Sequence, residues 1–205
     1  MSAISNIIFD LGGVVIDIEA ERTKSALQLL LRHSKGDDNI FKSDYFFKYE
    51  TGLIGSDQFL DALLMHSRDG VTRENLIVAW NSMIIGIPVE RLKIIKELSN
   101  RFRLFVLSNT NSLHVSFFES MIPCEYDFKR LFEKVYYSHL IGSRKPDTEA
   151  FFAVLSDSGL QPRETLFIDD LDDNIECAEK IGMKVLHLNP PGFKGFANTR
   201  YSNLL

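Results

Sequence analysis

The sequence predicts an α/β fold, a doubly wound parallel sheet with an inserted all-helical segment. From Pro88 onward, short apolar runs alternate with segments of helical periodicity, which is typical of a parallel sheet covered on both faces. Residues 19–86 have helical periodicity instead. Several apolar runs end directly in polar residues, and open α/β sheets place their chemistry at that edge.

The first predicted strand ends at Asp10. The stretch 5–17 is S-N-I-I-F-D-L-G-G-V-V-I-D, in which an apolar run stops at this aspartate. The Gly12-Gly13 pair that follows suits a backbone that turns tightly beside a ligand. Asp10 is therefore expected at the carboxyl end of a central strand. The alternative is an aspartate that only caps a turn or a helix.

The insertion is expected to contain three helices. Leucines in 27–31 share one face of a helix that fades at Gly36. A second helix is expected to start at Ser56 as its N-cap, and a third follows Thr72. We therefore assign residues 1–18 and 87–205 to a core domain and residues 19–86 to a helical domain.

The remaining elements are expected to alternate along the core. Strands are expected at 103–108, 134–138, 165–169 and 184–188, and helices at 89–100, 112–121, 147–159 and 172–181. Asp147 is a suitable helix start and Gly182 a suitable stop. The tail after Pro190-Pro191 is expected to be irregular.

Composition excludes several classes of partner. The 205 residues are 45% apolar and 25% charged with a formal net charge of −5, so there is no basic surface for nucleic acid. No apolar run is long enough for a membrane span, and we expect a cytoplasmic protein that is a monomer or a weak homodimer. Cys124 and Cys177 have no metal-ligand spacing and are expected to be free thiols.

The expected strand ends carry carboxylates, a hydroxyl and one lysine. These residues are Asp10, Ser108, Asn109, Lys145, Asp169 and Asp170. Carboxylate and carbonyl oxygens suit Mg²⁺, which often keeps a substrate phosphate among its ligands. A carboxylate can attack a phosphoryl group, while a metal ion, a lysine and a hydroxyl stabilise the charge that develops. The set therefore predicts Mg²⁺-assisted phosphoryl transfer from a phosphorylated substrate.

Four motifs in this order resemble the haloacid dehalogenase-like (HAD) hydrolase superfamily. They are F-D-L-G-G-V-V at 9–15, L-S-N-T at 107–110, R-K-P at 144–146 and F-I-D-D-L-D-D-N at 167–174. The helical insertion resembles the family's C1-type cap on a Rossmann-like core. The most similar members are bacterial sugar-phosphate phosphatases of the α-D-glucose-1-phosphate phosphatase type. The resemblance implies a phosphatase for a sugar phosphate such as a hexose 1-phosphate, with an aspartyl-phosphate intermediate.

The resemblance also implies the nucleophile and the metal ligands. Asp10 is similar to the nucleophile and to one metal ligand. The Gly12 carbonyl and the Asp170 carboxylate are similar to the other two.

Further residues match family positions around the phosphate. Ser108 and the backbone N–H of Asn109 would bind the phosphoryl oxygens, and Lys145 would neutralise Asp10 and the phosphate. Asp169 would orient a metal-bound water or Lys145. Asn174 would steady the acidic loop.

Gly12 departs from the family pattern, because most of these phosphatases carry there an aspartate that protonates the leaving oxygen. Such assistance is worth roughly 10²–10⁴-fold. An acidic anomeric leaving oxygen would need it least, which favours a sugar 1-phosphate. Alternatively Asp17, Glu50 or His114 delivers the proton through water, or the site is inactive.

The segment 45–55 and His114 are the other expected substrate contacts. E-T-G-L-I-G at 50–55 resembles a loop that family caps project toward the site, so Glu50 and Tyr49 are expected to contact the substrate. The simpler explanation is that Phe46, Phe47 and Tyr49 fill the helical core. The histidine is shared with the glucose-1-phosphatase type, although a helix histidine is more often a packing or surface residue.

The alternatives to a Mg²⁺-dependent phosphatase are a calcium loop, a dehalogenase and a binding protein. The run of aspartates at 169–173 lacks the spacing and closing glutamate of a calcium loop. A 2-haloacid dehalogenase would use a similar aspartate without Mg²⁺, so the Asp169-Asp170 pair counts against it. A binding or regulatory protein that kept this fold without turnover is the third alternative.

Overall fold

A five-stranded parallel sheet forms the centre of the core. The computed structural model describes residues 3–32, 43–189 and 191. The strand order is β5-β4-β1-β6-β7, and every neighbouring pair is parallel. The strands are β1 (Asn6–Phe9), β4 (Arg103–Ser108), β5 (Lys134–Tyr137), β6 (Thr165–Asp169) and β7 (Lys184–His187). The predicted parallel sheet is confirmed.

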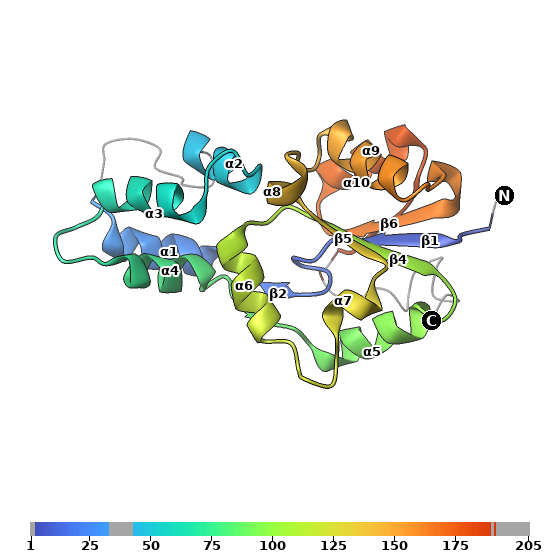
Figure 1. Ribbon diagram of the computed structural model, residues 1–205, viewed down its shortest axis with the longest axis horizontal. Helices are drawn as coiled ribbons and strands as arrows, with labels where there is room; N and C mark the ends of the chain where they lie inside the picture. Colours follow the sequence, from blue (N-terminus) through green and yellow to red (C-terminus); the bar gives the residue numbers. More distant parts are fainter. Residues whose placement is uncertain (1–2, 33–42, 190, 192–205) are drawn as a thin grey trace.

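Helices cover both faces of this sheet (Figure 1). One face packs on α5 (Val89–Leu98), α6 (Ser112–Ser120) and α7 (Phe128–Leu131), and the other on α9 (Thr148–Asp157) and α10 (Asp172–Ile181). The short α8 (Ser138–Ile141) follows β5. Successive residues of β1 enter opposite cores, since Ile7 and Phe9 pack in one cluster and Ile8 in the other. The strands are therefore continuous apolar runs rather than alternating ones.

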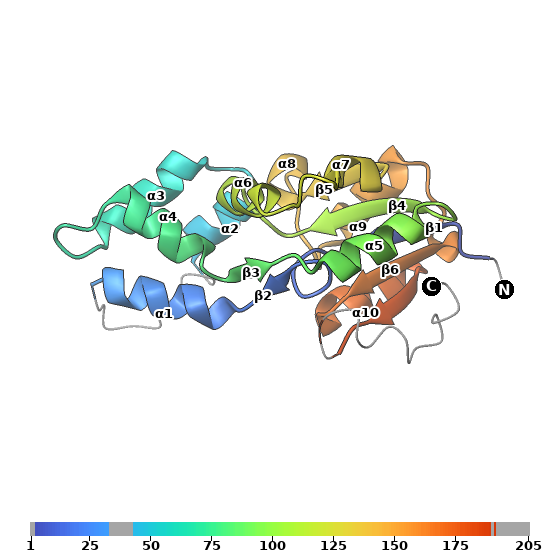
Figure 2. The same cartoon turned by 90° about the horizontal axis from the view of Figure 1, so that it is seen from below.

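The inserted segment forms four helices around a core of its own. They are α1 (Ala20–Leu30), α2 (Asp44–Glu50), α3 (Ser56–Met65) and α4 (Arg73–Asn81). Trp80, Phe59 and Tyr49 are buried at its centre, with the Tyr49 and Phe59 rings stacked at 4.4 Å between centroids. Figure 2 shows that an antiparallel ribbon of β2 (Asp17–Ile18) and β3 (Ile84–Gly86) joins these helices to the sheet.

Four local details differ from the expectations. Helix α2 was not predicted, and neither was the β2-β3 ribbon. Ser56 is the first residue of α3 rather than its N-cap; Gly55 is the cap, and its N–H donates to the side chain of Gln58. The hydroxyl of Ser56 instead lies 2.8 Å from that of Tyr49. Helix α1 ends at Leu30, because the backbone is already extended at Leu31, so the expected end near Gly36 is wrong. Most of the tail after Pro190 lies outside the described residues.

Within the described ranges, no helix has the length and apolar content needed to cross a bilayer. Cys124 and Cys177 are both free thiols, as predicted.

Candidate active site

Three neighbouring strands bring the predicted residues to one edge of the sheet. Asp10 follows β1 directly, and its N–H donates to the carbonyl of Ile168 in β6. Asp169 is the last residue of β6, and Ser108 the last of β4 on the other side of β1. Parallel strands end on the same edge, so residues remote in sequence meet there.

Lys145 connects two of the carboxylates. Its Nζ donates to Asp10 Oδ1 at 2.7 Å and to Asp169 Oδ2 at 2.6 Å. The lysine is 1% exposed, Asp169 is fully buried, and Asp10 is 8% exposed. A buried ammonium needs charged partners of this kind, and the two carboxylates satisfy it in an environment of low dielectric constant.

Burial and charge shift the pKa of these groups in opposite directions. Burial alone would lower the pKa of Lys145, but Asp10 and Asp169 outweigh it and raise the pKa. Burial raises the pKa of Asp10 to about 7, although Lys145 acts against the shift. Burial and the charge of Asp169 raise the pKa of Asp170 to about 6. The site therefore contains several carboxylates whose ionisation costs free energy unless positive charge lies close to them.

Asn109 fixes the main chain of Lys145. Its Nδ2 donates to the Lys145 carbonyl at 2.8 Å, and its Oδ1 accepts from the Lys145 N–H at 2.8 Å. The sequence suggested only a role for the backbone N–H of Asn109. The side-chain contact was missed because it joins two loops 36 residues apart in sequence.

Asp169 has little acceptor capacity left for a metal ion. Besides Lys145, it accepts from the N–H of Leu171 at 2.9 Å and from Nδ2 of Asn174, at 3.0 Å from each oxygen. Asp169 thus links the Lys145 ammonium to the loop that carries Leu171 and Asn174, and the roles expected for Asp169 and Asn174 stay predictions.

The carboxylates fit a small divalent cation. One oxygen each of Asp10, Asp169 and Asp170 lies within 4.8 Å of the others. Two oxygens on one Mg²⁺ are about 3–4 Å apart, given metal–oxygen distances of about 2.1 Å. Gly13 leaves room for this cluster, because a Cβ there would come within 2.2 Å of Asp170 Oδ2. With Asp169 already hydrogen-bonded, Asp10 and Asp170 are the carboxylates of this cluster that remain for a metal ion.

Glu50 lies at the junction of α2 with the loop that carries Lys145. The side chain is buried, and its Oε2 is 3.0 Å from Nε of Arg144. Burial raises the pKa of Glu50 to about 7, against the opposing charges of Arg144 and Lys145. The sequence analysis did not identify Arg144, although it directly precedes the predicted lysine in R-K-P.

His114 and Tyr49, which were also expected to contact the substrate, are packed against other side chains. His114 stacks on Trp80 at 5.1 Å and hydrogen-bonds to Asn111, and burial lowers its pKa to about 4. The Tyr49 hydroxyl bonds to Ser56 and accepts from the N–H of Leu113. These contacts are those of packing residues.

Three further predicted residues, Asp17, Phe46 and Phe47, have partners outside the carboxylate cluster. Asp17 pairs with Arg91 of α5 at 2.5 Å. Of the two phenylalanines, Phe46 is buried, whereas Phe47 is 40% exposed and lies under the Arg144 guanidinium, which is 4.9 Å from its ring centroid.

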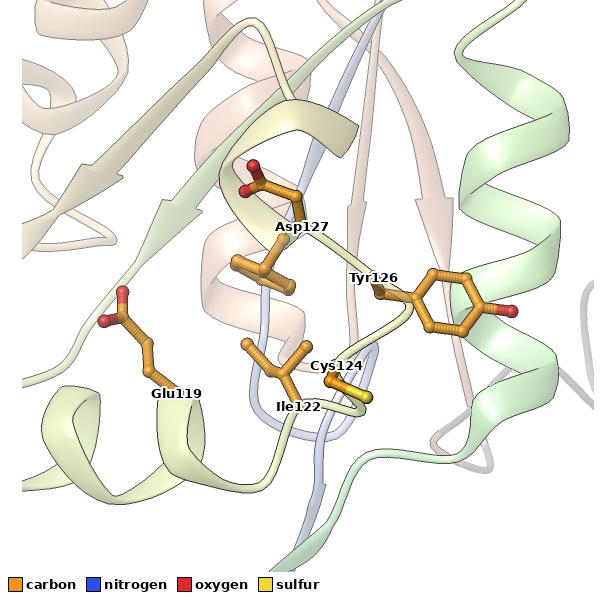
Figure 3. A pocket seen from close by; sticks show the side chains of 6 residues that line it. Glu119, Ile122, Cys124, Tyr126 and Asp127 are labelled. Atoms are coloured by element: carbon orange, nitrogen blue, oxygen red, sulfur yellow. The ribbon is translucent and has the colours of Figure 1, made fainter.

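A separate surface hollow lies along the α6–α7 connection (Figure 3). Its lining residues are Glu119, Ile122, Cys124, Tyr126, Asp127 and Phe128. The carboxylate cluster does not contribute to this lining, and we assign the hollow no role.

Sequence comparison finds relatives over most of the chain. The family described as haloacid dehalogenase-like hydrolase matches residues 82–188. A D-ribitol-5-phosphate phosphatase from Bacteroides thetaiotaomicron is 28% identical over 193 residues, which are 88% of this chain and 90% of that protein.

Solved structures show the same relationship. A HAD family enzyme from Bacteroides thetaiotaomicron in a magnesium complex is 30% identical with a TM-score of 0.83, covering 91% of this chain and 94% of that one. A complex with magnesium and inorganic phosphate is 31% identical at a TM-score of 0.83, covering 90% and 94%. A 2-haloacid dehalogenase from Pseudomonas syringae, at 19% identity and a TM-score of 0.59 over 91% and 87%, shares the fold alone.

Proposed function

Because the chain belongs to the haloacid dehalogenase-like hydrolases, we propose that it is a Mg²⁺-dependent phosphatase. Its substrate would be a small phosphorylated metabolite, a phosphate monoester of a polyhydroxylated molecule. The observation that carries this proposal is the contact of Lys145 with Asp10 and Asp169, with the Asp170 carboxylate within 4.8 Å of both aspartates. That set pairs a nucleophile with a fixed positive charge and a cation site. The solved relative with magnesium and inorganic phosphate supports the same chemistry.

Asp10, Asp170 and the Gly12 carbonyl would hold the metal ion. When bound, Mg²⁺ supplies positive charge that offsets the negative charge of the phosphoryl oxygens. It would also favour the ionised form of both aspartates, which burial otherwise disfavours.

The proposed reaction has two displacements at phosphorus. An oxygen of Asp10 attacks the phosphorus, and the bond to the leaving oxygen breaks, which forms an aspartyl-phosphate. Water then attacks the same phosphorus, the bond to Asp10 breaks, and phosphate leaves. Lys145, held by Asn109 and Asp169, keeps its charge beside the transferring group throughout, while Ser108 at the end of β4 would donate to a phosphoryl oxygen.

The helices of residues 19–86 would act as a cap that limits water at the site. Glu50 is the member of this segment paired with the catalytic loop, through Arg144. We propose that it faces the non-phosphate part of the substrate, as the sequence analysis suggested. The buried environments of Tyr49 and His114 favour supporting roles.

Two substrates are favoured by different observations. Gly12 has no side chain to protonate a leaving oxygen, which favours an acidic anomeric oxygen and thus a hexose 1-phosphate. The relative that hydrolyses D-ribitol 5-phosphate favours a pentitol phosphate instead. Both are phosphate monoesters of polyhydroxylated molecules.

Phosphate release with and without Mg²⁺ tests the proposal. We expect Mg²⁺-dependent release from glucose 1-phosphate or ribitol 5-phosphate, and none from the Asp10→Asn variant. Faster cleavage of glucose 6-phosphate than of glucose 1-phosphate would contradict the leaving-group argument. Halide release from 2-chloropropionate without metal would identify a dehalogenase, and no turnover of any of these compounds would favour a binding protein.

A further inference from the structure

Glu50 and Arg144 form an ion pair between two segments that are remote in sequence. Glu50 ends α2 of the inserted helices, whereas Arg144 lies in the core loop, directly before Lys145. Their side chains are 8% and 24% exposed, and the charge of Lys145 also acts on Glu50. The pair is therefore close to the lysine that contacts the proposed nucleophile, and it connects the inserted helices to the core.

The pair leaves hydrogen-bonding capacity unused. The 3.0 Å contact lacks hydrogen-bond geometry, so Glu50 Oε2 and the Nε–H of Arg144 are buried without a hydrogen-bond partner among the described residues. A buried polar atom in this state costs free energy, and a native structure normally supplies its partner from water or a ligand. Two such atoms side by side, one an acceptor and one a donor, indicate a missing polar group.

A hydroxyl is the group that suits both atoms. It can donate to a carboxylate and accept from a guanidinium at the same time. An additional anion would be repelled by Glu50 and an additional cation by Arg144, so the pair favours an uncharged ligand part. The rings of Phe46 and Phe47 lie 5.9 and 4.9 Å from the guanidinium carbon and hold its plane in place.

We propose that Glu50 and Arg144 together bind a hydroxyl of the leaving group and select neutral polyol and sugar phosphates over phosphate esters without hydroxyls. This inference rests on the proposed phosphatase function and adds a specificity determinant to it, Arg144. The raised pKa of Glu50 agrees with a carboxylate that lacks a donor.

Glu50→Gln and Arg144→Gln test the proposal, because each keeps the approximate size of the side chain and removes its charge. Turnover of ribitol 5-phosphate and glucose 1-phosphate is compared with that of 4-nitrophenyl phosphate, which has no hydroxyl. We expect KM for the better polyhydroxylated substrate to rise about 10- to 100-fold, the loss of one hydrogen bond to a charged group. KM and kcat for 4-nitrophenyl phosphate should change less than about threefold, which also shows that the variants are folded.

The matched control is a second Arg–Glu pair, Arg103 with Glu133, whose side chains are exposed. Arg103 is the first residue of β4, at the end of the strand opposite to the site. Arg103→Gln and Glu133→Gln should leave both substrates unaffected. Equal losses on both substrates in the Glu50 and Arg144 variants would show a purely structural pair and overturn the inference. Unchanged KM values would overturn it as well.

A binding measurement separates this inference from the proposed function. In the Asp10→Asn background with Mg²⁺, calorimetry should show that Glu50→Gln weakens binding of ribitol 5-phosphate or glucose 1-phosphate but not of phenyl phosphate. That result would support the hydroxyl site even if the wild-type protein released no phosphate. If Glu50→Gln leaves the affinity for ribitol 5-phosphate and glucose 1-phosphate unchanged, the inference is wrong, while the phosphatase proposal still stands.

Discussion

Asn109 shows how a single side chain can control the site without contacting the reacting atoms. Its amide accepts from and donates to the main chain of Lys145. Asn109→Ala should therefore lower kcat for every phosphate ester about 10- to 100-fold and the free energy of unfolding by about 1–2 kcal/mol. Asn109→Asp should have a kcat and a free energy of unfolding between those of Asn109→Ala and wild type. A carboxylate can accept from the Lys145 N–H but cannot donate to the Lys145 carbonyl.

Steady-state kinetics and urea unfolding measure both effects. Asn100→Ala is the control, since Asn100 also donates from its amide to a main-chain carbonyl, that of Lys96, at an exposed helix end. A similar loss of kcat in Asn100→Ala, or no loss in Asn109→Ala, would show that the main chain of Lys145 needs no side-chain support.

At this scale the sequence predicted identities better than contacts. Asp10, Lys145 and Asp169 were recognised because each belongs to a short motif, and a parallel sheet brings strand ends together. The partner of Glu50 was not predicted, because Arg144 lies 94 residues away and nothing local couples the two positions. The packing of His114 on Trp80 also depends on tertiary contacts that a helical pattern does not encode.

Among the elements, the loop between α2 and α3 has a specific requirement for glycine. Gly52 has a φ of +71°, and a Cβ there would lie 2.1 Å from the carbonyl oxygen of His139 in α8. Gly70 has a similar φ of +82° but no atom within 4 Å of such a Cβ. Alanine at either position costs about 1–2 kcal/mol for the left-handed backbone, and only at position 52 must the loop also move.

We therefore expect Gly70→Ala to lower the free energy of unfolding by about 1–2 kcal/mol with unchanged kinetics. Gly52→Ala should lower it further and raise KM for the polyhydroxylated substrate, because Gly52 lies only two residues after Glu50. Chemical denaturation and kinetics measure the two effects. Equal stability and equal KM in the two variants would mean that the contact with α8 is unimportant.

Elements with long apolar runs were predicted nearly residue by residue, whereas short ones were not. Strands β4 and β6 and helix α10 have the predicted bounds, since each has a continuous apolar stretch or a full helical face. The β2-β3 ribbon has only two and three residues per strand, too few for a period. In α2, adjacent aromatic residues hide the helical period, because Phe46 is buried and Phe47 is partly exposed.

For the whole molecule, three carboxyl groups, two of them buried and one partly buried, connect stability to pH and to metal. The pKa is raised to about 7 for Asp10 and Glu50 and to about 6 for Asp170, mainly by burial. The folded metal-free protein thus holds protons that the unfolded chain releases near pH 4, so these groups lower stability as pH rises from about 4 to 7. His114, with its pKa lowered by burial to about 4, acts in the opposite direction below about pH 6.5.

Magnesium isolates the contribution of the two proposed ligands, because His114 titrates equally with and without it. Binding requires ionised Asp10 and Asp170, so the rise in Tm caused by Mg²⁺ should be larger at pH 7.5 than at pH 5.5. At a hundredfold excess over Kd the gain is about 2.7 kcal/mol, or about 5–10 °C for a chain of this size. Scanning calorimetry with EDTA or Mg²⁺ measures this difference.

Asp170→Asn distinguishes a defined metal site from general screening of an acidic surface. The variant should lose the rise in Tm caused by Mg²⁺ and melt higher than wild type in EDTA at pH 7.5, because one partly buried negative charge has been removed from a cluster of three. Asp173→Asn, a change at an exposed residue three positions further on, should keep the full rise in Tm caused by Mg²⁺. If both variants keep it, the cation binds elsewhere, and the carboxyl edge of the sheet serves another purpose.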